Sequence, residues 1–192
     1  MKAIIATGNR IDSSKGLSWY FIADSCMANA GKPFFIPDFA DSFDAVIAPV
    51  VRISRLGKSI ASKFAPRYYQ EIAPAIHFQA TDLYDSLLQE GRSPDMALNF
   101  DRSIIIGNFM KAEDFLSSAP LELVKNGETV AEWTPSMFSS GIDDVIEAVS
   151  ATNTLKTGDL IVPGISVPTV IAPGDRIELR LNGEKLLLVA IK

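Results

Sequence analysis

Histidine and cysteine, two residue types that often serve in catalysis and metal binding, each occur once in this sequence, as His77 and Cys26. An imidazole can act near neutral pH as a general base or as a metal ligand. His77 is flanked by Ile76 and Phe78, and a histidine in an apolar run is more often a hydrogen-bonded core residue, so both interpretations stay open. Cys26 has no basic neighbour to stabilise a thiolate, which disfavours it as a nucleophile.

Several carboxylates have positions that favour a structural role. Asp82 precedes a helix expected over 83–91, so its side chain is expected to cap that helix. Asp143 and Asp144 fall in the first turn of a helix expected over 142–150, where the helix dipole favours negative charge.

The last third of the chain contains the clearest signals for secondary structure. Asn126-Gly127 and Asn182-Gly183 are typical of two-residue hairpin turns, because both positions of such a turn need residues that accept positive φ. Glycine also marks tight turns at Gly158 and Gly174. Between these turns lie short runs rich in leucine, isoleucine and valine, which predict strands at 121–124, 160–162, 176–181 and 186–191.

The first two thirds mix strand and helix signals without regular alternation. Helices are expected at 17–30 and 83–91 and a single turn at 112–116, while strands are expected at 3–6, 32–37, 45–53 and 103–107. Within the 45–53 run, Pro49 is expected to force an edge or a bulge, since proline has no N–H for a ladder. The segment 7–15 is polar. These patterns predict an α+β fold dominated by a mixed or antiparallel β assembly, with helices packed outside.

Composition limits the class of protein. The chain has 192 residues, 47% of them hydrophobic, which is ample for one domain with a sizeable core. A net charge of −5 without a basic run argues against a nucleic-acid partner. The longest apolar run is too short to cross a membrane or to form a signal peptide, so a cytoplasmic location is expected. A single cysteine excludes an intramolecular disulfide.

The order of motifs resembles the fumarylacetoacetate hydrolase family. The hairpin Leu121–Glu128 is similar to the family's "L-x-V-NGE", and Met137-Phe138 to its "MIF" element before a helix. Further along, 155–165 is similar to "L-x-PGDLI-TGTP" and 171–179 to "L-x-PGD-V-V". In the middle of the chain, 78–83 is similar to "D-x-SARD-x-Q" and 97–101 to "AK-FD".

This resemblance implies a β-rich, mixed, rolled sheet of the family's C-terminal-domain type with a few peripheral helices, in a protein that is often a homodimer. It implies one domain over 1–192, with a divergent N-terminal elaboration at 1–31 and a core at 32–192. It also implies a small 2-oxo or 1,3-dicarbonyl acid as substrate, for C–C hydrolysis, decarboxylation, hydration or tautomerisation. The cofactor implied is Mg²⁺ or another divalent cation, held by three carboxylates.

Many of the family's site residues are replaced at the matching positions. The third metal carboxylate falls on or next to His77. No E-x-E pair occurs at its expected place near 41–48, where the nearest acids are Asp41 and Asp44. Glu71 is a compensating carboxylate or a solvated surface residue. The resemblance therefore implies a metal set of Asp44, Glu71 and His77, or no metal at all. Mg²⁺ prefers about six oxygen ligands, so this set would better suit Zn²⁺, Mn²⁺ or Fe²⁺.

The remaining site residues follow the same matches. Asp82 takes the place of the motif's aspartate, so His77 and Asp82 are the catalytic candidates. Asp101 is retained from "AK-FD", whereas the lysine position is Leu98. The "TGT" element becomes Pro163-Gly164-Ile165, which gives these three and Asp101 as substrate-binding candidates. Two hypotheses follow: an enzyme on a small 2-oxo acid with an altered metal site, or a non-catalytic ligand-binding or scaffold protein.

Overall fold

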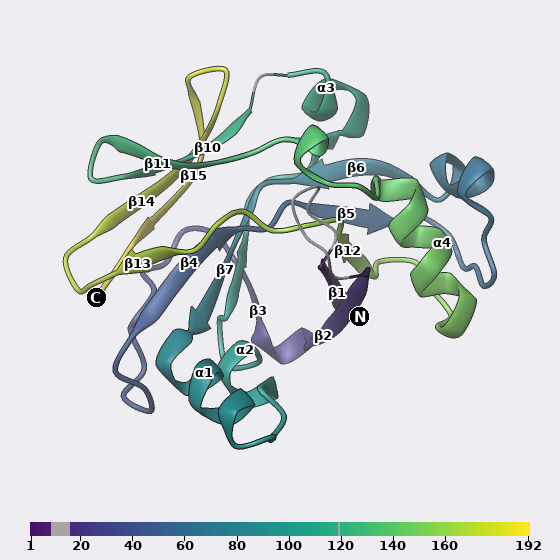
Figure 1. The fold of residues 1–192 in the computed structure, drawn as a ribbon. Coiled ribbons are helices and arrows are strands. Elements are labelled where there is room, and N and C mark those ends of the chain that lie inside the picture. Colours follow the sequence, from purple (N-terminus) through teal and green to yellow (C-terminus); the bar gives the residue numbers. More distant parts are fainter. Residues whose placement is uncertain (9–15, 119) are drawn as a thin grey trace.

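The computed structural model describes residues 1–8, 16–118 and 120–192, and this part of the chain forms three β-sheets with short peripheral helices (Figure 1). In the six-stranded sheet the order is β2 (Ser18–Ala23), β1 (Lys2–Thr7), β12 (Leu160–Val162), β5 (Val50–Ile53), β6 (Tyr69–Ala73) and β9 (Met110–Lys111). In the five-stranded sheet it is β13 (Thr169–Ile171), β4 (Phe43–Ile47), β7 (Ala75–Ala80), β8 (Ile104–Ile106) and β3 (Met27–Asn29). The four-stranded sheet contains β11 (Glu128–Trp133), β10 (Leu121–Lys125), β14 (Arg176–Leu181) and β15 (Glu184–Ala190).

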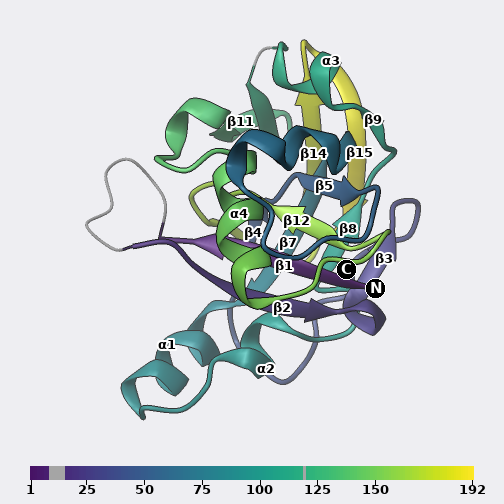
Figure 2. The ribbon, with the colours of Figure 1, turned by 90° about the vertical axis from the view of Figure 1, so that its right-hand side faces the viewer.

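Helices lie around these sheets, as Figure 2 shows for α1 and α2 below them and α4 beside β12. The α-helices are α1 (Thr81–Gln89), α2 (Asp95–Leu98), α3 (Ala112–Leu116) and α4 (Ile142–Thr152). Short 3-10 helices occur at Asp24–Cys26, Ser62–Arg67 and Pro135–Met137. The expected α+β class and the helices near 83–91, 112–116 and 142–150 are therefore confirmed. None of the helices in the described ranges is long and apolar enough to span a bilayer.

The two Asn-Gly hairpins form as predicted. Asn126 and Gly127 have φ of 53° and 95°, and Asn182 and Gly183 have 52° and 77°. Each turn joins two antiparallel strands, β10 to β11 and β14 to β15. Positive φ at both turn positions gives a backbone twist that matches the twist of the strands. The sequence thus specifies the two hairpins, and the antiparallel pairing of β10 with β14 joins them into the four-stranded sheet.

The helix expected at 17–30 is wrong, because this segment contains β2, a 3-10 turn and β3. All six residues of β2 pair antiparallel with β1, from Lys2 opposite Ala23 to Thr7 opposite Ser18. The run Trp19-Tyr20-Phe21-Ile22 is rich in aromatic and β-branched residues, which favour a strand when a partner strand is available. Of the strand expected at 32–37, only Phe34 forms a bridge, to Ile191.

Pro49 also differs from expectation. It lies between β4 and β5, each of which has a neighbour on both sides, so neither strand is an edge strand. The pairing register continues across the gap, from Ile47 opposite Ile76 to Val50 opposite Ala73, which places Pro49 opposite Pro74. Neither proline can donate a ladder hydrogen bond. The two prolines therefore mark the point at which one two-stranded ribbon passes from the five-stranded to the six-stranded sheet.

Two apolar cores fill the space between the sheets. The larger core lies against one face of β4 to β7 and also includes residues of the four-stranded sheet and of α4; the opposite face of these strands contacts the smaller core. The smaller one lies between the six-stranded and five-stranded sheets, and it contains Ala3, Ile5, Ile22, Cys26, Ala48, Val50, Ala73, Ala75, Ile104, Ile106, Leu160 and Val162. We call the side of the ribbon that faces this smaller core the interior face.

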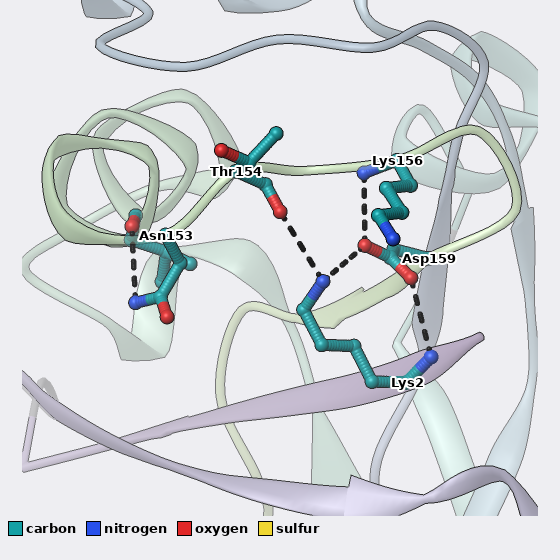
Figure 3. A network of polar contacts seen from close by, with 6 residues as sticks. Lys2, Asn153, Thr154, Lys156 and Asp159 are labelled. Atoms are coloured by element: carbon teal, nitrogen blue, oxygen red, sulfur yellow. Dashed lines mark hydrogen bonds and ion pairs between the residues drawn. The ribbon is translucent and has the colours of Figure 1, made fainter.

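A buried aspartate fastens the start of β1 to the turn before β12 (Figure 3). Asp159 is 2% exposed and accepts hydrogen bonds from the backbone N–H of Lys2 at 3.2 Å and of Lys156 at 2.9 Å. The ammonium of Lys2 pairs with the same carboxylate and donates to the carbonyl of Thr154 at 3.3 Å. These contacts help to hold the parallel register of β1 and β12, in which Ala3 lies opposite Leu160. The carboxyl ends of both strands consequently meet at one edge.

Candidate functional site

The interior face of the ribbon carries the residues predicted to hold a metal. Going along the ribbon, the paired positions on this face are Arg52 with Glu71, Val50 with Ala73, Ala48 with Ala75, Val46 with His77, and Asp44 with Gln79. Successive strand residues alternate between faces, so the even positions of one strand and the odd positions of the other share this side. Polar side chains occur only at its two ends, with alanine and valine between them. The expected metal set is thus divided between opposite ends of one face.

His77 lies fully buried, and its ring is bonded to protein on both sides. Its Nε2 donates to the carbonyl of Leu98 at 3.0 Å, while Nδ1 lies 3.2 Å from both the hydroxyl of Tyr20 and the amide nitrogen of Gln79. These partners fit a neutral ring with its proton on Nε2 and an acceptor at Nδ1. Burial lowers the pKa of His77 to about 4, although the bond to Leu98 acts in the opposite direction.

Asp44 lies at the same end of the ribbon and is 6% exposed. Its carboxylate accepts a hydrogen bond of 2.7 Å from the hydroxyl of Thr81. The neighbouring Asp82 does not cap α1 through its side chain, contrary to expectation. It accepts instead from the backbone N–H groups of Asp41 at 2.9 Å and Ser42 at 3.2 Å. Desolvation raises the pKa of Asp82, but these hydrogen bonds outweigh it and hold the pKa below its usual value.

Glu71 lies at the other end of the interior face, about half exposed. The guanidinium of Arg52 pairs with its carboxylate, with Nε 3.0 Å from Oε2. Arg52 also covers the ring of Phe109, 4.1 Å from its centroid. The sequence interpretation of Glu71 as a solvated surface residue agrees with this placement.

The residues present do not fit a divalent cation. His77 would have to break its contacts with Leu98 or with Tyr20 and Gln79 to free a nitrogen, and Glu71 is paired with Arg52 at the far end. A cation such as Mg²⁺ needs several oxygens that converge on one point. In the ranges that the structure describes, no three side chains from histidine, cysteine, aspartate and glutamate are grouped to hold a metal.

A pocket of about 250 Å³ opens where the carboxyl ends of β1 and β12 meet. The residues that line it are Ala6, Thr7, Gly8, Phe138, Ile165, Ser166, Val167 and Pro168. Its position follows from the parallel pairing of the two strands, because the segments that leave them must leave on the same side. This pocket lies next to the expected "TGT"-like segment.

Among the predicted substrate-binding residues, Ile165 lines this pocket. Gly164 lies just behind it: its carbonyl accepts from the indole of Trp133 at 2.9 Å, and a Cβ at this position would lie 2.3 Å from the ring of Phe138. Pro163 is buried beside Trp133 and Phe138 in a smaller hollow. Asp101 is exposed in the turn after α2 and does not line the pocket.

Sequence reasoning missed Tyr20 and Gln79 as partners of His77, and Thr7 and Phe138 as lining residues of the pocket. Tyr20 was assigned to a helix, and its contact with His77 depends on the pairing of β2 with β1, which no local pattern indicates. For Phe138 a signal was present, because it belongs to the "MIF"-like element. The segment 9–15, part of the polar stretch noted above, lies outside the described residues.

Comparison with known proteins gives one consistent answer about ancestry. The family model described as fumarylacetoacetate (FAA) hydrolase C-terminal matches residues 9–187. The oxaloacetate tautomerase FAHD1 of Rattus norvegicus is 26% identical over 159 residues, which span 81% of this chain and 72% of that protein. Its Mus musculus counterpart is 26% identical over 161 residues, with the same shares covered.

Solved structures share the fold at lower identity. A Burkholderia cenocepacia protein provisionally named a fumarylpyruvate hydrolase has a TM-score of 0.91 and 21% identity, covering 100% of this chain and 88% of that one. The fumarylpyruvate hydrolase of Pseudomonas aeruginosa, solved with Mn²⁺ and pyruvate, has a TM-score of 0.88 and 17% identity, with 100% and 89% covered. At these identities the likeness concerns the fold.

Proposed function

This chain belongs to the fumarylacetoacetate hydrolase family, and we propose that it is a member that binds a small molecule without the divalent-metal chemistry of an oxo-acid enzyme. One observation carries the proposal. At the predicted metal position, the side chains on the interior face already have partners within the protein, and His77 has one on each ring nitrogen. The pocket beside Ile165 is the site that we assign to the ligand.

The chemical consequence concerns the charge that develops during the reaction. Enolates of 2-oxo acids need strong electrostatic stabilisation, and losing a single such stabiliser commonly costs about 10²–10³ in rate. Here the Asp44 carboxylate is bonded to Thr81 and the Glu71 carboxylate to Arg52. Neither carboxylate, nor the neutral His77 ring, supplies a positive charge to an enolate oxygen. The interior face is therefore suited to stability more than to this chemistry.

A second candidate function is turnover of a small 2-oxo acid with an altered metal site. The relatives favour it, because two of them are oxaloacetate tautomerases and one structural neighbour is a fumarylpyruvate hydrolase with Mn²⁺ bound. Family members thus act on small oxo acids. In this candidate Asp44 and His77 would rearrange to meet a cation, with Asp82 beside them.

Calorimetric titration of the purified protein with Mg²⁺, Mn²⁺ and Zn²⁺, combined with assays on oxaloacetate and an acylpyruvate, separates the two candidates. The rat tautomerase serves as a positive control for turnover of oxaloacetate, and the Pseudomonas aeruginosa fumarylpyruvate hydrolase as a positive control for cation binding. We expect neither stoichiometric cation binding nor turnover. Binding at one cation per chain that is lost in Asp44→Asn, together with turnover, would replace the proposal by the second candidate.

Two further properties are proposed from the sequence alone, a homodimeric state because of the family resemblance and a cytoplasmic location because of the short apolar runs. Light scattering coupled to size exclusion measures the first, and fractionation of the source cells measures the second. Neither property enters the argument for the ligand-binding function.

A further inference from the structure

Both side-chain hydroxyls in the described wall of the pocket at the ends of β1 and β12 already have a hydrogen-bond partner within the protein. The hydroxyl of Thr7 lies 3.0 Å from that of Ser18, so the two hydroxyls bond to each other. Ser166 accepts from the backbone N–H of Ile47 at 2.9 Å and donates to the carbonyl of Val167 at 2.9 Å. These internal bonds reduce the hydrogen-bonding capacity that the two hydroxyls can offer to a polar ligand.

Charge is also missing from this wall. Apart from Thr7 and Ser166, the side chains that line the pocket are hydrocarbon or glycine, and the described lining contains no acidic or basic residue. Moving an ionised carboxylate from water into such surroundings is strongly unfavourable unless it is paired. The described part of the wall thus disfavours the charge of a carboxylate ligand.

The wall behind the pocket is held in place. Phe138 packs against Gly164 so closely that a Cβ there would lie 2.3 Å from the ring, and Trp133, which bonds the Gly164 carbonyl, has its ring centroid 5.8 Å from that of Phe138. The Phe138 ring, packed against Gly164 and Trp133, provides a flat apolar surface in the wall of the pocket.

The volume limits the size of the ligand. At about 250 Å³ the pocket is larger than an apolar cavity of about 150 Å³ that admits benzene. It is smaller than the roughly 300–1,000 Å³ of sites for drug-sized ligands. A single ring or a short hydrocarbon chain matches this space.

We infer that the pocket selects an uncharged apolar group, such as one aromatic ring or a short hydrocarbon chain, and discriminates against carboxylates. This inference rests on the proposed function, because it names the class of ligand for the site assigned there. Specificity for this class would be determined by Phe138, Ile165 and Val167, whose hydrocarbon side chains line the pocket.

The test compares toluene with benzoate, which differ by a carboxylate in place of a methyl group on the same ring. Both are titrated into the ¹⁵N-labelled protein, and binding is followed by the amide shifts of Ile165, Ser166 and Val167. Saturable shifts at these amides with toluene, and at least tenfold weaker binding of benzoate, are the expected result. Equal or tighter binding of benzoate, or no saturation by toluene, would overturn the inference.

Two matched variants locate the effect. Val167→Phe fills the pocket from its rim and is expected to weaken toluene binding at least tenfold. Val170→Phe makes the same change at another exposed valine, outside the pocket, and is expected to stay within twofold of the parent protein. Both sites are exposed, at 48% and 66%, so both variants should fold. Equal effects of the two would also overturn the inference, whereas the metal titration tests the proposed function separately.

Discussion

His77 and Glu71 lie on the same face of one β-ribbon, but their surroundings give them opposite properties. His77 is fully buried with a protein partner on each ring nitrogen, whereas Glu71 is about half exposed and pairs with Arg52. Burial makes the protonated imidazole unfavourable, while water screens the Arg52–Glu71 pair. The comparison shows that a polar side chain contributes more to the free energy of unfolding at the buried His77 end of the ribbon than at the exposed Glu71 end.

The largest effect is expected from His77→Ala. The change leaves a cavity and removes the partner of the Leu98 carbonyl and of the Tyr20 hydroxyl. We expect the free energy of unfolding to fall by about 3–4 kcal/mol. Urea denaturation measures it, with Glu71→Ala as the matched truncation at the exposed end. A loss below about 1 kcal/mol would mean that the His77 end does not differ from the Glu71 end.

Lowering the pH below 6.5 is expected to reduce the free energy of unfolding through His77. The folded-state pKa of about 4 lies below the ordinary value of 6.5, so the unfolded chain binds a proton that the folded chain excludes. The contribution of a neutral His77 is therefore fully present above pH 6.5 and is lost as pH falls from 6.5 towards 4. The total is about 3 kcal/mol.

Urea unfolding of the parent protein and of His77→Gln at pH 7 and pH 5 measures this pH-dependent contribution of His77 to stability. The parent should lose about 2 kcal/mol more than the variant over that interval. Tyr20 and Gln79 also contact the ring, but neither titrates between pH 5 and pH 7. Burial raises the pKa of Tyr20, and the side-chain amide of Gln79 does not ionise. Parallel pH profiles for the two proteins would contradict a buried neutral histidine.

A smaller loss of stability is expected when the hydrogen bond to Asp44, at the same end of the ribbon as His77, is removed. Thr81→Val keeps the shape of the side chain but removes the 2.7 Å hydrogen bond to the nearly buried Asp44. Stability should fall by about 2 kcal/mol, because a buried carboxylate loses a donor. Thr81→Ser, which keeps the hydroxyl, should recover most of the loss in thermal unfolding. If Ser and Val behaved alike, the hydrogen bond would not be the cause.

The smallest effect is expected at the exposed end. Glu71→Gln removes the charge that pairs with Arg52 while Arg52 keeps its contact with Phe109. A change below about 1 kcal/mol is expected, and it should shrink further at high salt because exposed charges are screened. A salt-independent loss above about 2 kcal/mol would show that this pair is as strongly coupled as the buried end.

The regions that could be predicted from sequence are those whose structure is local. Asn126-Gly127 and Asn182-Gly183 specify their own turns, and the apolar spacing of α4 specifies its helix. The segment 17–30 could not be predicted in this way, because its helical spacing competes with a strand partner, β1, that only the fold brings alongside. The same limit applies to Asp82, whose backbone partners Asp41 and Ser42 are 41 and 40 residues away, respectively.

The sequence by itself determined the family, the α+β class and the C-terminal hairpins, and it predicted that carboxylates are replaced at metal positions of the family. Only the tertiary structure decided what the replacements do. It put Tyr20 and Gln79 against His77, left Glu71 at the far end with Arg52, and set Ile165 beside the apolar pocket. Turn geometry depends on neighbours in the chain, whereas burial, and with it the charge state of His77, depends on strands that meet from distant positions.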